Sequence, residues 1–152
     1  MSHSETVSHS ENLAVPAVSV WNLLIDWGSI IDWMPPGNIR HLRLEGEGIG
    51  AVRHIVTEQA VAIAERLDDL DESRGQLRLS IIEPMPWGML SYSAITNLED
   101  AGPDQCRLDW SGTFELAEGG DAANELAAFL KKAYASMFAG IRKQLMDGNI
   151  NE

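Results

Sequence analysis

The sequence predicts an α+β fold in which a curved antiparallel sheet of about seven strands wraps around one long C-terminal helix. Two observations carry this prediction. Between residues 126 and 145, apolar residues recur at spacings of three and four, which is the pattern of one buried helical face. Before that stretch, short segments alternate between apolar and polar residues and are separated by turn residues, as in half-buried antiparallel strands.

The long helix is expected to cover residues 121–147. Asp121 follows two glycines and is a good N-cap, while Gly148 is a natural helix stop. At 1.5 Å per residue, such a helix is roughly 40 Å long and needs a large apolar partner surface. Its buried face is predicted to contain Leu126, Phe129, Leu130, Ala133, Tyr134, Met137, Phe138, Ile141 and Leu145.

The N-terminal part of the chain predicts one strand and two short helices. Residues 1–4 are expected to form a loose tail, and residues 6–13 a first strand. Pro16 suits the start of a helix, which is expected to run to Ile25. A second short helix is predicted at residues 29–34, stopped by Pro35-Pro36-Gly37.

Six strands connected by short turns are predicted between the short helices and the long one. Because the connections are short, the strands form a meander of antiparallel neighbours. The rigid loop from Pro84 to Gly88 presents Trp87. The predicted strands cover residues 39–45, 51–57, 61–70, 76–82, 89–98 and 106–116.

Composition narrows the class of protein and its partners. The chain has 152 residues, which suits one domain spanning residues 1–152, and 45% of them are hydrophobic. Its formal charge of −12 disfavours nucleic acid and anionic membranes as partners. The single cysteine, Cys106, favours a reducing compartment, and the start of the chain has no visible signal peptide, so we expect a cytoplasmic protein. The sequence leaves a homodimer open.

No cofactor or metal is expected from the pattern of polar residues. No spacing of histidine, cysteine and carboxylate residues resembles a zinc site. Gly46, Gly48 and Gly50 could suggest a dinucleotide fingerprint, but they connect two strands and do not open a helix.

The face of the sheet that looks toward the helix follows from the alternation of side chains along each strand. Its bulky members would line or fill a cavity beneath the helix. Three tryptophans, Trp27, Trp33 and Trp87, would mark the cavity mouth or a protein contact if they are exposed. The inner face is predicted to include Leu77, Leu79 and Ile81, then Leu90, Tyr92, Ala94, Thr96 and Leu98, then Leu108, Trp110, Gly112, Phe114 and Leu116.

Glu65 is the most informative single residue, because an acidic side chain on an apolar face costs several kcal/mol unless it has a partner. If the turn after residue 57 centres near Gln59, residues whose numbers sum to about 118 are paired, and Arg53 lies directly opposite Glu65. One interpretation is a functional pair inside the cavity, and the other is a structural ion pair with the same geometry. Tyr92 is likewise either a core aromatic residue or a ligand contact.

Several local motifs occur in an order that resembles the START-like helix-grip superfamily (SRPBCC), and within it the polyketide cyclase/dehydrase-like branch. The resemblance extends from about Glu5 to Leu145 and implies the helix-grip fold with an internal ligand cavity. The motifs are Val15 to Trp21, Trp33-Met34-Pro35, Gly50-Ala51-Val52-Arg53, Glu65-Arg66-Leu67, Leu79 to Ile82, Tyr92, and Trp110 to Phe114.

The resemblance also implies a site. The Gly-x-x-Arg and Glu-Arg-Leu motifs are similar to those of lachrymatory-factor-synthase-like members, whose catalytic residues are the arginine and the glutamate of these motifs. The resemblance implies that, in this chain, Glu65 would move a proton and Arg53 would hold an anionic or polarised oxygen. Tyr92 completes the expected catalytic set. The expected contacts to substrate are Trp33, Ile55, Ile63, Leu79, Ile81, Trp87, Leu90, Trp110, Phe114, Tyr134, Met137 and Phe138.

Two functions remain open at this point. One is an enzyme that catalyses cyclisation, dehydration, isomerisation or lyase chemistry on a small hydrophobic or aromatic molecule by proton transfer. The other is a carrier or sensor of such a ligand. The hormone receptors of this superfamily have a longer gate where this chain has only residues 58–60, which weakens a gated-receptor interpretation.

Overall fold

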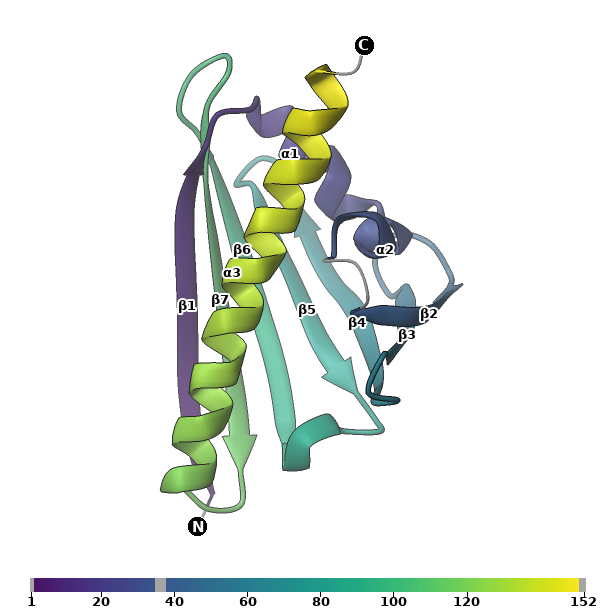
Figure 1. Ribbon diagram of the computed structural model, residues 1–152, viewed down its shortest axis with the longest axis vertical. Helices are drawn as coiled ribbons and strands as arrows, with labels where there is room; N and C mark the ends of the chain where they lie inside the picture. The colour runs from purple at the N-terminus through teal and green to yellow at the C-terminus, as the bar shows by residue number, and fades with distance from the viewer. Residues whose placement is uncertain (1, 35–37, 151–152) are drawn as a thin grey trace.

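The structure is a computed structural model that describes residues 2–34 and 38–150. One strand is followed by short helices, six further strands and a long C-terminal helix (Figure 1). The elements are β1 (His3–Leu13), α1 (Ala17–Ile25), η1 (Trp27–Ser29), α2 (Ile30–Trp33), β2 (Ile39–Glu45), β3 (Val52–Thr57), β4 (Ala62–Asp71), β5 (Gln76–Ile82), η2 (Pro86–Gly88), β6 (Ser91–Asp100), β7 (Cys106–Leu116) and α3 (Asp121–Ile150).

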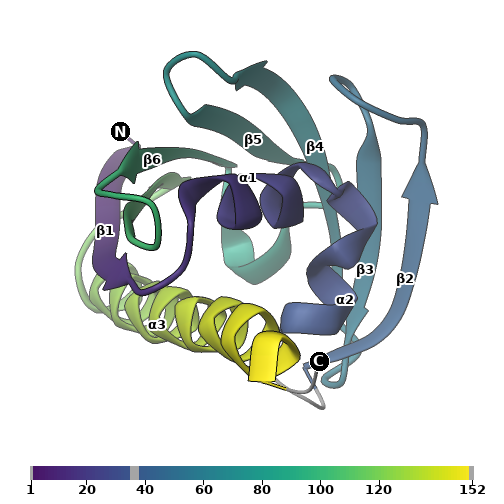
Figure 2. The same cartoon turned by 90° about the horizontal axis from the view of Figure 1, so that it is seen from above.

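The seven strands form one antiparallel sheet in the order β1-β7-β6-β5-β4-β3-β2. From β2 to β7 each strand pairs with the next one in sequence, and β1 closes the far edge by pairing with β7. Seen from above, the sheet curls around an interior that α3 covers on one side, while α1 and α2 lie across one end (Figure 2). This is the predicted α+β helix-grip architecture, so the expected fold is confirmed.

The ends of several elements differ from the prediction. Strand β1 begins at His3, so His3 and Ser4 belong to the sheet and not to a loose tail, because β1 pairs with β7 along its whole length. Helix α3 continues to Ile150 beyond the expected stop at Gly148, and a glycine within a helix costs only about 1 kcal/mol. The predicted stop at Pro35-Pro36-Gly37 lies outside the described residues.

The core lies between the inner face of the sheet and α3. Strand β7 alternates almost perfectly, with Leu108, Trp110 and Phe114 buried between more exposed neighbours. On α3 most of the predicted face is buried, while Ala133 and Leu145 are partly buried and Phe129 is 48% exposed. Successive residues of a helix are about 100° apart, so Phe129 lies at the border of the apolar stripe.

Candidate functional site

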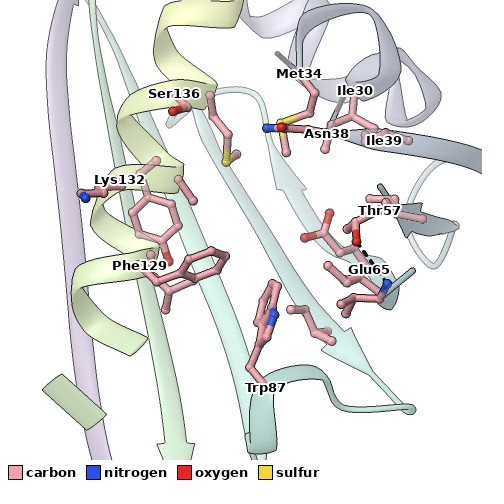
Figure 3. A pocket seen from close by; sticks show the side chains of 18 of the residues that line it. Ile30, Met34, Asn38, Ile39, Thr57, Glu65, Trp87, Phe129, Lys132 and Ser136 are labelled. Carbon is pink, nitrogen blue, oxygen red and sulfur yellow. Dashed lines mark hydrogen bonds between the residues drawn. The ribbon is translucent and has the colours of Figure 1, made fainter. Parts of the chain in front are cut away.

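A pocket of about 590 Å³ lies between the sheet and α3, on the side away from β1 (Figure 3). This volume falls within the usual range for small-molecule sites. Most of its wall is apolar, and it draws on α2, α3, η2 and strands β2 to β7. The apolar and aromatic lining residues include Ile30, Met34, Ile39, Ile55, Val61, Ile63, Ile81, Trp87, Trp110, Phe129, Leu130, Ala133 and Met137.

Glu65 contributes a carboxylate to this apolar wall. Strands β3 and β4 pair so that Arg53 is directly opposite Glu65, which confirms the predicted register. The Arg53 Nε–H donates a hydrogen bond of 2.7 Å to Glu65 Oε1. The Glu65 side chain is 15% exposed and extends into the pocket, as Figure 3 shows.

Arg53 lies behind Glu65 and is not one of the residues that line the pocket. It is only 2% exposed, and its guanidinium carbon lies 3.6 Å from the centre of the Trp27 ring. Its Nη1 also donates a hydrogen bond of 3.5 Å to the Trp27 carbonyl oxygen. Burial lowers the pKa of Arg53, and the charge of Glu65 acts in the opposite direction. Arg53 therefore binds Glu65 from the side away from the pocket, whereas the sequence predicted that both residues lie inside the cavity.

Two tyrosine hydroxyls meet at another part of the pocket wall. Tyr92 Oη on β6 and Tyr134 Oη on α3 form a hydrogen bond of 2.6 Å. Burial raises the pKa of Tyr134 to about 12, and burial also raises the pKa of Tyr92, so both phenols stay protonated near neutral pH.

Gly112 on β7 makes the tyrosine pair possible. A Cβ atom at this position would overlap the Tyr134 hydroxyl and crowd the Tyr92 hydroxyl. The glycine in the Trp-Ser-Gly-Thr-Phe motif thus has a steric role: it leaves room on the inner face of the sheet for two phenol groups.

An aromatic pair forms the rim of the pocket. Trp87 in η2 and Phe129 on α3 are both partly exposed, and their rings pack edge to face with centroids 5.1 Å apart. Trp87 has a positive φ of 56°, which is uncommon for a bulky residue. The predicted opening near residues 84–88 agrees with this position of Trp87.

The structure brings together nine of the predicted site residues in the pocket wall: Ile55, Ile63, Glu65, Ile81, Trp87, Tyr92, Trp110, Tyr134 and Met137.

The remaining five predicted substrate contacts lie elsewhere. Leu79, Phe114 and Phe138 are fully buried in the core and do not line the pocket. Trp33 is buried and its indole N–H donates to the Ser29 hydroxyl. Leu90 precedes β6 and is exposed, because the alternation of the strand begins only at Ser91.

Sequence reasoning also missed several pocket residues. Phe129, Leu130 and Ala133 share a helical face with Tyr134 and Met137, so the same spacing could have indicated them. Of the three tryptophans that would mark the mouth or a protein contact if exposed, Trp27 and Trp33 are buried, and only Trp87 is exposed and lines the pocket.

Comparison with protein families identifies the class of this chain. Residues 4–146 match the model of the family described as polyketide cyclase / dehydrase and lipid transport. The chain therefore belongs to this family, within the SRPBCC superfamily, and membership implies binding of a small hydrophobic ligand. No protein of curated function matches the sequence.

Solved structures with the same fold come from plants and bacteria. A point mutant of norcoclaurine synthase from Thalictrum flavum, solved with a transition-state analogue, superposes with a TM-score of 0.81 at 16% identity, covering 98% of each chain. XoxI from Bacillus cereus superposes with a TM-score of 0.78 at 21% identity, and the match covers 95% of this chain and 97% of XoxI. A protein from Thermobifida fusca superposes with a TM-score of 0.77 at 24% identity, and the match covers 91% of each chain. These similarities support the fold.

Within the described part of the chain, no helix is long and apolar enough to cross a membrane.

Proposed function

We propose that the protein binds a small apolar molecule in this pocket and catalyses cofactor-independent proton transfer on it, with Glu65 as the base. The observation that carries the proposal is a carboxylate held at the wall of an apolar pocket by a buried arginine. Arg53 occupies Oε1, and no other described residue donates a hydrogen bond to Oε2. Oε2 is therefore the oxygen that can accept a proton from a ligand.

The apolar wall favours this role for Glu65. Water that would compete for the carboxylate is displaced when an apolar ligand fills the pocket, and electrostatic interactions inside become stronger. A base needs to reach the proton that it abstracts within hydrogen-bonding distance. The extension of the Glu65 side chain into the pocket supports this requirement.

The tyrosine pair supports a second role, the stabilisation of negative charge on a ligand oxygen. Two hydroxyls carry two protons, and their mutual hydrogen bond uses only one of them. The other proton is available to a ligand acceptor. A hydrogen bond to an oxygen that becomes negative in the transition state is worth several kcal/mol in a water-excluded site. In this proposal, Tyr92 and Tyr134 take the role that the family resemblance implied for Arg53.

These groups together favour a ligand that combines an apolar ring or chain, an acceptor oxygen such as a carbonyl, and an acidic hydrogen nearby. Removal of that hydrogen can begin a cyclisation, dehydration, isomerisation or lyase reaction. Norcoclaurine synthase, which shares the fold, was solved in complex with dopamine and hydroxybenzaldehyde. That complex supports an aromatic ligand for the pocket described here.

The base can be tested with nitrobenzisoxazole, an apolar aromatic probe. A base removes its ring C–H proton, the N–O bond breaks, and a coloured nitrophenolate carrying a nitrile forms. We expect saturable turnover by the wild type, measured by absorbance, and a fall of at least about 100-fold in Glu65→Gln. Binding should persist in that variant, measured as quenching of tryptophan fluorescence by the nitro group.

Glu58→Gln is the matched control, because Glu58 is exposed at the neighbouring hairpin and does not line the pocket. This variant should turn over the probe as the wild type does. If Glu65→Gln retained wild-type turnover, Glu65 would not be the base. Tyr134→Phe should lower the rate without abolishing it, since Tyr92 keeps its hydroxyl.

A carrier is the second candidate, and the largely apolar wall favours it. In that case, the probe would bind to the wild type without turnover above the Glu65→Gln level. Native mass spectrometry of freshly purified protein would then be expected to show a bound apolar molecule that denaturation releases.

A further inference from the structure

Trp27 makes three separate contacts with the ion pair behind the pocket. Its ring packs against the Arg53 guanidinium, with 3.6 Å between the guanidinium carbon and the ring centre. Its carbonyl oxygen accepts a hydrogen bond from Arg53 Nη1. Its indole N–H donates a hydrogen bond of 3.0 Å to the backbone carbonyl of Glu65. One residue thus contacts both the arginine and the strand that carries the glutamate.

These contacts restrict the motion of the ion pair. Arginine has a long side chain with many rotamers, and a buried ion pair is favourable only when its geometry is well fixed. The Trp27 ring covers one face of the guanidinium plane, and a cation over an indole face is attracted by the ring quadrupole. The bond to the Glu65 carbonyl fixes strand β4 at the residue whose carboxylate enters the pocket.

The position of Trp27 suits this task and does not suit ligand contact. It lies in η1, between the two short helices, is almost completely buried, and does not line the pocket. Without the ring, Arg53 could rotate toward the pocket and bond both oxygens of Glu65. A carboxylate with both oxygens bonded would have no free oxygen for a ligand proton.

We propose that Trp27 is a positioning residue that holds Arg53 behind Glu65 and thereby keeps Glu65 Oε2 directed into the pocket. This inference rests on the proposed function of Glu65 and extends it to a residue outside the pocket.

The test uses Trp27→Phe, which keeps an aromatic face but lacks the N–H, and Trp27→Leu, which lacks both. The first readout does not depend on turnover: the Arg53 Nε–H signal in nitrogen-15 NMR spectra. In the wild type this signal should be resolved and slow to exchange with water. Exchange should accelerate at least about tenfold in Trp27→Leu and less in Trp27→Phe. If Trp27→Leu does not fold, the result in Trp27→Phe decides.

The second readout is turnover of nitrobenzisoxazole. A misdirected base should lower kcat about 10- to 100-fold while KM changes less than about twofold, because misplacement of a catalytic group affects the transition state most. Trp27→Phe should recover part of that loss. Trp21→Phe is the control, since Trp21 is a buried tryptophan of α1 that does not line the pocket, and both readouts should match the wild type.

Two results would overturn the inference. One is that the Arg53 Nε–H exchanges with water as slowly in both Trp27 variants as in Trp21→Phe. The other is that this signal is lost in the Trp27 variants while kcat stays unchanged. If wild-type turnover is absent but the signal depends on Trp27 as described, the base proposal fails while the role of Trp27 in holding the ion pair stands.

Discussion

The two halves of the sheet share one pattern of alternating side chains but differ in what lies against them. Along β1, α3 packs directly on the sheet, and Phe138 is fully buried with its ring against His9 of β1. On the side of β3 and β4, α3 lies across the interior from the sheet, as Figure 2 shows, and the pocket lies between them. The same inner face therefore borders a solid core in one half and a pocket in the other.

One row of paired residues runs across the strands of both halves. Arg53 pairs with Glu65, Glu65 with Ile81, Ile81 with Tyr92, and Tyr92 with Phe114. Glu65 and Tyr92 lie on the pocket side of this row. On the other side the row continues from Phe114 to Glu5 on the edge strand β1. Glu65 and Tyr92 both have a hydrogen-bond partner and both line the pocket, so neither polar group is buried alone.

The largest expected difference between the halves concerns two phenylalanines of α3. Phe138→Ala should lower the free energy of unfolding by about 3–5 kcal/mol, because the fully buried ring leaves a cavity. Phe129→Ala should cost far less, since that ring is 48% exposed at the pocket rim. Urea unfolding of both variants measures the difference, and equal losses would contradict the division into two halves.

The two residues of the ion pair should differ in how much stability the protein loses when each is replaced. Glu65→Leu should destabilise the protein by about 3 kcal/mol, because it leaves the Arg53 charge buried without its partner. Arg53→Met should cost less, since the remaining Glu65 carboxylate faces the pocket and can be hydrated there. The double variant should recover much of the loss. Thermal and urea unfolding of the three proteins test this order, and an equal cost for both single variants would refute it.

A substitution at Gly112 tests how tightly strand β7 packs against the hydroxyls of Tyr92 and Tyr134. Gly112→Ala should destabilise the protein by about 2 kcal/mol, because the added methyl group overlaps the Tyr134 hydroxyl and forces a shift. Removal of both hydroxyls, in Tyr92→Phe with Tyr134→Phe, should reduce that cost. An unchanged cost in the triple variant would show that the strand itself, and not the phenols, rejects the methyl group.

The smallest expected effect is a loss of stability at alkaline pH that belongs to the pocket half. The pKa of Tyr134 is raised from 10.0 to about 12, so this tyrosine contributes stability that is complete below pH 10 and is lost as pH rises through 12. At pH 11 the contribution has fallen by about 1.4 kcal/mol, since one pH unit above the unfolded pKa corresponds to roughly that free energy. Tyr134→Phe should make the free energy of unfolding fall less steeply between pH 10 and 12, while Tyr92, whose pKa is also raised, keeps its own share. An unchanged slope in a series of urea unfolding measurements would contradict the prediction.

The sequence by itself determined the order of elements, the long helix and the register of the ion pair. Alternation and helical spacing are local patterns, and a tight turn fixes which residues of two adjacent strands are opposite, so Arg53 and Glu65 could be paired from their numbers.

Only the tertiary structure decided which inner-face residues line a pocket and which fill the core. That division depends on where α3 leaves the sheet, and long-range packing sets this path. At Gly140, a Cβ atom would overlap the Trp33 carbonyl oxygen, so the glycine allows α3 to approach α2 closely. The same packing of α1, η1 and α2 buries Trp27 against Arg53. Contacts between residues so distant in the chain leave no periodic signal in the sequence, because periodicity reports only the face of a single element.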